Sequence, residues 1–417
     1  MDIKKIVEKY NKTNLVLRIF IGIIIGVALA ITLPKMDWLS VLGDLFVGAL
    51  KAIAPMLVLI LVMSSLAQGV KSAGGKFRTV ISLYMFSTFL AAITAVVASF
   101  LFPQTLTLNT EAQDIGAVPQ GLSEILHNLL VKIVINPISS LSESNYLGIL
   151  FWAIITGLAL KDIVSDSTKS MLKDFSTSVS QIVAWIINLA PFGIMGLVYH
   201  SVSTNGLEIF HQYGKLILLL AICMFIVALI TNPIIIAILA KRNPYPLILT
   251  CLKESGITAF FTRSSAANIP VNMKLCEKLN LDRDMYSVSI PLGATINMSG
   301  GAVTITIMAL AAAHTLGIEV SFSTAVILSV LATFAACGAS GIAGGSLLLI
   351  PSACSLFGVS NDVAIQVVGI GFIISVLQDS LETALNSSSD VVFTATAEYY
   401  QKRKLSKKQE KELVIQH

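Results

Sequence analysis

Five polar side chains interrupt the last long apolar segment of the chain, which is apolar at 367–374 and again at 391–393. At helical spacing they share one face, because they stand at i, i+3, i+4, i+7 and i+11. The five residues are Asp379, Glu382, Thr383, Asn386 and Asp390. An ionised side chain at membrane depth costs at least ~2.5 kcal/mol, so this face has to look into protein, water, ions or substrate. A solvated amphipathic helix on a surface is the alternative, which the apolar flanks disfavour.

Composition places this segment in a membrane protein. The chain is 55% hydrophobic and 12% charged, whereas a soluble protein is about a quarter charged. The fourth of its apolar segments is overlong and is broken near Asn136-Pro137 and at 142–145, so we expect several short helices there. The predicted class is an all-α, polytopic membrane protein with eight transmembrane segments, each near or above the ~20 residues that cross a bilayer. They lie at 15–34, 41–69, 79–103, 122–162, 171–201, 211–240, 286–313 and 361–398.

The basic residues are unevenly placed along the chain, and their places matter more than the net charge of +4. Lys and Arg gather before the first segment and after the second, fourth, sixth and eighth, whereas the loop at 104–120 has none. By the positive-inside rule, this pattern predicts that both termini are cytoplasmic. That prediction requires an even number of spans, in agreement with the count of eight. The basic tail at 399–417 is expected to be solvated.

The chain lacks the motifs of the common enzyme classes. Its cysteines are scattered without a CxxC pair, its histidines are dispersed, and no glycine run ends in Lys-Ser or Lys-Thr. A zinc site, a Ser-His centre and ATP-driven transport are therefore disfavoured. An intramembrane hydrolase could use Asp379 and Asp390, or Ser340, but the two aspartates are about 16 Å apart along a helix and no base has a fixed spacing from Ser340. We expect no enzymatic activity, no conventional cofactor and no nucleic-acid partner.

Two further apolar segments are too interrupted to cross the membrane as single helices. Residues 246–273 are split by the polar run at 262–270, and residues 323–356 by the glycine-rich run at 336–345. Neighbouring charges put the ends of the first on the cytoplasmic side and those of the second on the outer side, which predicts two re-entrant hairpins of opposite entry. Non-helical backbone at that depth is tolerated where it is buried or lines a cavity. A glycine-rich packing helix is the alternative for the second segment.

The seventh segment is interrupted between Pro291 and Gly301. A proline and several glycines there free backbone carbonyls. Together with the side chains of Asn297 and Asp390, these oxygens would form a cage suited to a hard cation, and we predict Na⁺. A proton relay through the acids of the eighth segment is the rival use of the same carboxylates.

Each hairpin precedes a broken or polar span, which predicts two inverted repeats. Inverted repeats with a binding site near the membrane midplane are typical of secondary transporters. A channel lined by the polar eighth segment is the alternative from another class, and the occluding hairpins disfavour it.

Three ordered motifs resemble the dicarboxylate/amino acid:cation symporters, the glutamate-transporter family. They are Thr262-Arg263-Ser264-Ser265, the run at 291–298, and Asp379 followed by Asn386 and Asp390. The resemblance covers nearly the whole chain. Within the family, the runs at 260–273 and 378–380 are similar to bacterial sodium-coupled members that carry serine and threonine.

The resemblance implies a homotrimer in the bacterial cytoplasmic membrane, in which each protomer has a fixed scaffold and a transport domain that moves as an elevator. By analogy the scaffold is 15–75 and 122–205, and the transport domain is 79–103 and 211–398, which includes both hairpins. The coupling ion would be Na⁺, and the other partners would be L-serine, L-threonine and the lipid bilayer.

The resemblance also implies which residues bind the substrate. Asp379 would hold the ammonium group, and Asn386 with the amide of Ser265 would hold the α-carboxylate. The full set of implied substrate positions is Arg263, Ser264, Ser265, Gly301, Ile342, Asp379, Glu382, Thr383 and Asn386.

Two sodium sites are implied in the same way. The first would consist of the carboxylate of Asp390 with backbone at Gly293, Asn297 and Asn386. The second, closed by the outer hairpin, would consist of Thr295 with the carbonyls of Ala336, Cys337 and Ala339.

This chain departs from the family pattern at three positions. Members that carry acidic substrates have an arginine at the position of Glu382. The negative charge of Glu382 would repel aspartate or glutamate by several kcal/mol. Its carboxylate can instead accept a hydrogen bond from a hydroxyl. Ser299 replaces the aspartate of a third sodium site, whose other positions remain as Tyr84, Ser87 and Thr88, and Gly301 replaces a substrate-contacting threonine. We therefore predict Na⁺-coupled import of serine and threonine. Coupling to H⁺, a broader range of small neutral amino acids, or a substrate-gated ion channel are the alternatives.

Overall fold

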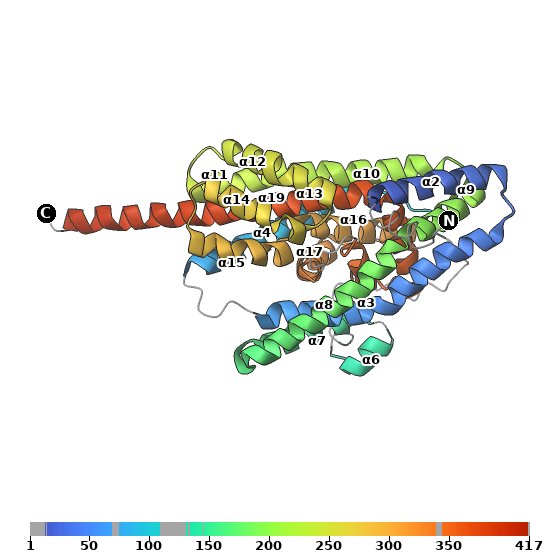
Figure 1. Cartoon of the computed structure of the whole chain (residues 1–417), viewed down its shortest axis with the longest axis horizontal. Coiled ribbons are helices and arrows are strands. Elements are labelled where there is room, and N and C mark those ends of the chain that lie inside the picture. The colour runs from blue at the N-terminus through green and yellow to red at the C-terminus, as the bar shows by residue number, and fades with distance from the viewer. Residues whose placement is uncertain are drawn as a thin grey trace, which may run out of the picture.

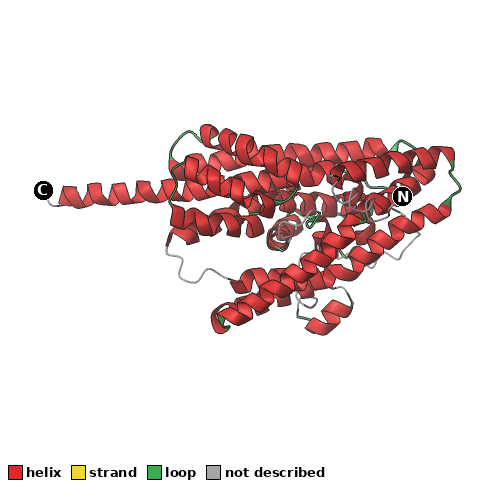
Figure 2. Ribbon diagram, in the orientation of Figure 1, coloured by secondary structure: helices red, strands yellow, loops and turns green. Residues whose placement is uncertain are grey.

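The computed structural model describes residues 13, 15–68, 75–108, 131, 134–143, 145–338 and 344–415. Within these ranges the chain forms helices joined by loops and turns, with no strand (Figure 2). Five helices in the described part are long and apolar enough to cross a membrane, or six if one bent pair counts as a single span. This agrees with the predicted all-α membrane class, whereas the count of eight spans stays a prediction.

The first half of the described chain contains seven α-helices and one 3₁₀ turn. The predicted fifth span is not straight, because α8 and α9 meet at Leu189 with a bend of 52°. Pro191 lies in the first turn of α9 and has no N–H to continue the ladder of α8. The elements are α2 (Leu15–Thr32), η1 (Asp37–Leu39), α3 (Ser40–Gln68), α4 (Gly75–Leu101), α6 (Pro137–Ser142), α7 (Tyr146–Ile163), α8 (Asp166–Asn188) and α9 (Ala190–Asn205).

The overlong fourth segment forms separate short helices where the structure describes it, as predicted. The Asn136 side chain accepts hydrogen bonds at the start of α6, and the Asn145 side chain accepts one from the backbone N–H of Gly148 at the start of α7. Asparagine is a preferred N-cap residue, so each one starts a new helix. Residues 122–130 lie outside the described ranges.

The second half covers the two segments that were predicted as re-entrant hairpins, and it contains the interrupted seventh segment. Two single π-helical turns, η2 and η3, lie in the sixth span and in the first hairpin. The elements are α10 (Ile209–Ile226), η2 (Val227–Thr231), α11 (Asn232–Ala240), α12 (Tyr245–Cys251), η3 (Leu252–Gly256), α13 (Ile257–Thr262), α14 (Ser265–Lys278), α15 (Arg283–Ile296), α16 (Ser299–Thr315), α17 (Phe322–Cys337), η4 (Leu347–Leu349), α18 (Ile350–Cys354), η5 (Ser355–Phe357) and α19 (Asn361–Ile415).

The helix breaks fall inside the predicted runs but are shorter than predicted. The first hairpin is non-helical only at Arg263 and Ser264, and the seventh span only at Asn297 and Met298. Pro270 and Pro291 lie inside helices α14 and α15 instead of in the breaks. Pro270 is exposed and Pro291 is half-buried, yet both residues have helical backbone, which the low helix propensity of proline would not predict. The tip of the second hairpin, at 339–343, lies outside the described residues.

The helices pack in two groups. In the first, α2 packs against α9, and α3 packs against α7, α8 and α9. In the second, α4 packs against α16 and α17, while α13, α14, α15 and α16 pack against α19. The approach of α2 to α9 depends on a glycine, because a Cβ atom on Gly22 would lie 2.3 Å from the carbonyl oxygen of Pro191. The division into a scaffold and a transport domain stays a prediction.

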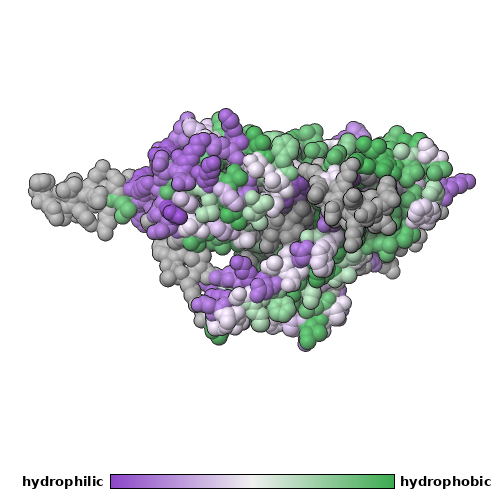
Figure 3. Space-filling model, viewed as in Figure 1, coloured by the Kyte–Doolittle hydropathy of each residue, from purple (hydrophilic) through white to green (hydrophobic). Residues whose placement is uncertain are grey.

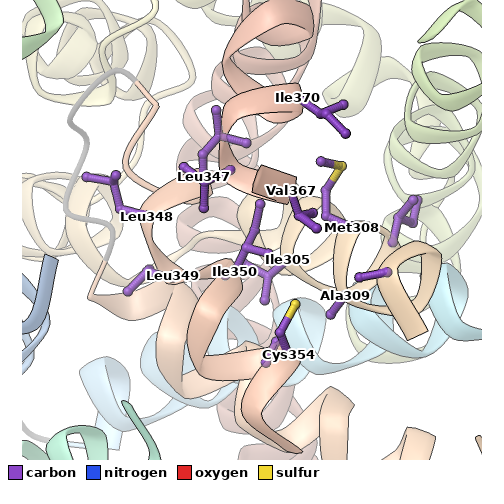
Figure 4. Close-up of a cluster of buried hydrophobic side chains, with 14 of the residues drawn as sticks. Ile305, Met308, Ala309, Leu347, Leu348, Leu349, Ile350, Cys354, Val367 and Ile370 are labelled. Carbon is purple, nitrogen blue, oxygen red and sulfur yellow. The ribbon is translucent and has the colours of Figure 1, made fainter. Parts of the chain in front are cut away.

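Helix α19 runs through the second group and then projects from the body as a long helix toward the C-terminus (Figure 1). The described part of the predicted tail, 399–415 of 399–417, therefore continues the eighth segment as one helix. Its apolar part is buried in protein, with Val367 and Ile370 beside Ile305 and Met308 of α16 (Figure 4). The second hairpin covers the same cluster through Leu347 and its neighbours (Figure 4). The core thus surrounds the helix that carries the acidic residues.

Candidate functional site

The break in the first hairpin carries a buried arginine that reaches α19. Arg263 ends α13 in the left-handed region, at φ 52°, and its N–H donates to the carbonyl of Ala259 at 2.8 Å. A left-handed backbone is costly for a residue with a side chain, so packing has to hold it there. Nε of Arg263 donates to Oδ2 of Asp379 at 2.7 Å, with both side chains buried. Ser264 then starts α14, because its hydroxyl accepts from the N–H of Ala267 at 3.2 Å.

Glu382 lies one turn further along α19, and one of its oxygens receives three donors. Oε2 accepts from the hydroxyl of Thr304 at 2.9 Å and from the hydroxyl of Ser346 at 2.8 Å. It also accepts from Nε2 of Gln378, at 2.5 Å. Hydrogen bonds to an ionised group are about twice as strong as those between neutral groups. The site therefore holds a carboxylate by means of hydroxyl and amide donors.

Helix α16 begins directly against the same stretch of α19. The backbone N–H of Gly300 donates to Oδ1 of Asn386 at 2.7 Å. A Cβ atom on Gly300 would lie 2.8 Å from Cα of Glu382, and one on Gly301 would lie 3.2 Å from its Oε1. Only glycine allows this approach at position 300, which brings the break of the seventh span to the acidic face.

Asn297 and Asp390 meet at that break. Nδ2 of Asn297 donates to Oδ1 of Asp390 at 2.9 Å and to the carbonyl of Asn386 at 3.1 Å. Oδ1 of Asn297 is buried and has no hydrogen-bond partner in the described part of the chain. Gly293 also lies against Asp390, because a Cβ atom on Gly293 would be 2.5 Å from Oδ1 of Asp390. A carboxylate, an unpartnered amide oxygen and bare backbone are the donor set that a hard cation prefers.

The residues of the implied second sodium site come together in part. The thiol of Cys337, at the end of α17, donates to the carbonyl of Ile296 at 3.4 Å, next to Thr295. The Thr295 hydroxyl donates to the carbonyl of Leu292 at 2.7 Å. Ala336 is buried at the end of the same helix. Ala339, like the predicted substrate contact Ile342, lies outside the described residues.

The position of the third sodium site of the family holds a cluster of hydroxyl groups. The hydroxyl of Ser299 lies 3.2 Å from that of Ser87 and 3.5 Å from that of Thr88. Ser87 also donates to Oδ1 of Asn232 at 2.9 Å. Tyr84 lies apart from this cluster, with its hydroxyl donating to carbonyls on α15 and α19. These neutral groups satisfy one another without a carboxylate among them.

Comparison with known proteins identifies the family. The model of the sodium:dicarboxylate symporter family matches residues 15–399. The chain belongs to this family. Three relatives, each a serine/threonine transporter SstT, are similar to it. The protein of Bifidobacterium adolescentis is 59% identical over 398 residues, which are 95% of this chain and 92% of that protein. Those of Streptococcus agalactiae serotype III and Streptococcus thermophilus (strain ATCC BAA-250 / LMG 18311) are 58% and 56% identical over 395 residues, or 95% of this chain and 98% of each protein.

The comparisons confirm the predicted symporter family and the prediction that the chain is not an enzyme, since the family and its named relatives are transporters. The intramembrane hydrolase is thereby set aside. The predicted sites of this symporter stay predictions, although the structure brings Arg263 to Asp379 and Asn297 to Asp390. Ser265, two residues after Arg263, and Thr383, next to Glu382, are also buried. Neither side chain makes a hydrogen bond to a residue that the structure describes.

Sequence reasoning missed the polar groups that surround the acids of this symporter. Thr304, Ser346 and Gln378 were not predicted as partners of Glu382. Gln378 lies four residues before Glu382 on α19, so the shared helix face was a signal for it. Thr304 and Ser346 come from other elements and gave no such signal.

A second missed network joins the first hairpin to α19. Nδ2 of Asn272 donates to the carbonyl of Ser387 at 2.9 Å, and Nδ2 of Asn268 donates to the Ser387 hydroxyl at 2.8 Å. Ser255 donates to Oδ1 of Asn272 at 2.5 Å from the π-helical turn η3. Single π-helical turns inside α-helices are frequent at functional sites. Asn268 and Asn272 are spaced by four residues on α14, so their side chains share one face of that helix.

Proposed function

We propose that this protein is a secondary active transporter that imports serine and threonine by symport with Na⁺. The observation that carries the proposal is the carboxylate of Glu382, which accepts from two hydroxyl groups inside the protein. A site that stabilises a carboxylate with hydroxyl donors is suited to a substrate hydroxyl and disfavours a substrate carboxylate. The names of the relatives support the same substrates.

In this proposal the substrate lies between α19, the break of the first hairpin and the second hairpin. Asp379 binds the ammonium group of the substrate. This group replaces Arg263 as the partner of the Asp379 carboxylate. Asn386 and the amide of Ser265 hold the α-carboxylate, and Glu382 accepts from the side-chain hydroxyl. The remaining positions that line the substrate are Arg263, Ser264, Gly301, Ile342 and Thr383.

Sodium is transported with the substrate and is proposed to bind in two places. The first comprises Asp390 with backbone at Gly293, Asn297 and Asn386, and the unpartnered Oδ1 of Asn297 supports an ion there. The second comprises Thr295 with the carbonyls of Ala336, Cys337 and Ala339. The contact of Cys337 with the carbonyl next to Thr295 supports this second set.

The proposed architecture has eight spans and two re-entrant hairpins in a bacterial cytoplasmic membrane, with both termini cytoplasmic. The scaffold is 15–75 and 122–205, and the transport domain, 79–103 and 211–398, slides against it as an elevator within a homotrimer. The packing of α2, α3, α7, α8 and α9 mainly against one another supports the division. Hydrophilic residues gather where α19 leaves the body, which supports a cytoplasmic face at that end (Figure 3).

Uptake of labelled L-serine into proteoliposomes tests the proposal. We expect accumulation under an inward Na⁺ gradient, no accumulation when choline replaces Na⁺, and competition by threonine but not by aspartate. Accumulation under an inward H⁺ gradient alone would contradict Na⁺ coupling, but it would still agree with a secondary transporter. Steady current without serine would favour a channel instead.

A further inference from the structure

A groove on the outside of the helix bundle combines apolar walls with a cationic end. It has a volume of about 920 Å³ and lies between α4 and α11, with Tyr400 of α19 beside it. The exposed side chains of Phe86, Ile234 and Ile238 form much of its wall. Along α4 it runs from Arg78 to Leu90, which is about 18 Å at 1.5 Å per residue. That length is close to one leaflet, or half of the ~30 Å hydrocarbon core.

One arginine lines the end of the groove near Tyr400, and a second arginine lies over the ring of that tyrosine. Arg78 lines the groove directly, and it makes no ion pair or hydrogen bond with a residue that the structure describes. The guanidinium of Arg403 lies 5.9 Å from the ring centre of Tyr400. Its Nη1 is buried and lacks a hydrogen-bond partner in the described ranges. A buried guanidinium N–H without a hydrogen-bond partner costs free energy, which an acceptor that the Arg403 side chain can reach would recover.

The nearest carboxylate on α19 does not neutralise these arginines. Glu398 pairs with Lys402 at 2.6 Å and accepts from the backbone N–H of Asp282 at 2.8 Å. Another arginine of this end, Arg242, stacks on the ring of Tyr399 at 4.1 Å. This end of the groove therefore keeps a net positive charge, and the rest of the groove is apolar.

We propose that this groove binds one anionic phospholipid. The phosphate group lies between Arg78 and Arg403, and one acyl chain fills the space between α4 and α11. Basic pockets between transmembrane helices bind anionic headgroups in this way, and each arginine near the surface contributes about 1 kcal/mol, or about fivefold in affinity. A zwitterionic lipid of the same chains loses most of this gain, because its own ammonium offsets the charge of its phosphate.

Native mass spectrometry of the purified full-length protein tests the proposal. The probes are dioleoyl phosphatidylglycerol and dioleoyl phosphatidylcholine, added at equal concentrations. We expect the anionic lipid to bind about tenfold or more tightly to the wild type. The double variant Arg78→Ala/Arg403→Ala is expected to lose this preference, while the control Arg283→Ala, an exposed arginine at the start of α15, keeps it.

A second variant separates the groove from surface charge. Ile238→Trp fills the groove and leaves both arginines, so it is expected to weaken the binding of both lipids. Equal binding of the two lipids to the wild type would overturn the proposal. An equal loss of preference in Arg283→Ala would overturn it in favour of general surface charge. Displacement of phosphatidylglycerol by inorganic phosphate at equal ionic strength would overturn it in favour of a free-anion site.

Discussion

The guanidinium of Arg263 lies 2.7 Å from a carboxylate oxygen of Asp379, and both side chains are buried. The pair joins the break of the first hairpin to α19 across 116 residues of sequence. A buried ion pair is tolerated because each charge compensates the other. In the proposed function, the ammonium group of the substrate is a second cation that competes for the same carboxylate.

Asp379→Asn is expected to abolish serine uptake. The substitution removes the charge that anchors the ammonium group, and it also leaves Arg263 buried without a counter-charge, which costs about 3–5 kcal/mol of stability. Uptake in proteoliposomes and thermal unfolding of the purified protein measure the two effects separately. The double variant Asp379→Asn/Arg263→Ala should recover stability without uptake.

Ser380→Ala is the matched control for this prediction. Its hydroxyl donates to the carbonyl of Val376 within α19 and makes no hydrogen bond to Asp379. Near-normal uptake by the control and full uptake by Asp379→Asn would together remove the anchor role from Asp379.

Glu382→Arg is expected to reduce serine uptake and to make aspartate a competitor. The change removes the acceptor for a hydroxyl and supplies a cation that can pair with a side-chain carboxylate. The neutral control Glu382→Gln keeps the size of the side chain, so it should lower serine affinity without admitting aspartate. Competition assays with serine, threonine and aspartate distinguish these outcomes, and unaltered selectivity in Glu382→Arg would argue against the proposed role.

Ser346→Ala is expected to raise the KM for serine about tenfold, the effect of losing one hydrogen bond to a charged group. The hydroxyl of Ser346 ties the second hairpin to Glu382, so its loss loosens the hairpin over the substrate. Ser352→Ala is the control, because that hydroxyl bonds to Leu349 within the same hairpin. An equal KM for both variants would show that the contact of Ser346 with Glu382 does not affect binding.

Asp390→Asn is expected to eliminate the stimulation of uptake by Na⁺, because it removes the charged ligand of the first proposed sodium site. Ser299→Ala, in contrast, should leave the Na⁺ dependence unchanged, since the cluster around Ser299 is neutral and satisfied by Ser87 and Thr88. Serine uptake measured over a range of Na⁺ concentrations compares the two. A lower Hill coefficient in Ser299→Ala would instead place a third ion there.

Much of the fold could be predicted from local patterns. The apolar segments, the break at Arg263 and the break at Asn297 depend on the composition of a few adjacent residues. The lengths of the breaks could not be predicted, because Pro270 and Pro291 lie in helices that neighbouring elements stabilise. The bend at Leu189 was missed although Pro191 marks it. The fifth segment, at 171–201, was long enough to be predicted as one span, so the signal of Pro191 was overlooked.

The sequence by itself determined that Asp379, Glu382, Asn386 and Asp390 share one face of a membrane helix, because helical spacing needs no knowledge of other segments. The tertiary structure decided which groups meet that face. Thr304 and Ser346 reach Glu382 from positions 78 and 36 residues away. Only the packing of α16 and the second hairpin on α19 brings them there, since a hydrogen bond requires atoms within about 3 Å and sequence spacing alone does not set such distances.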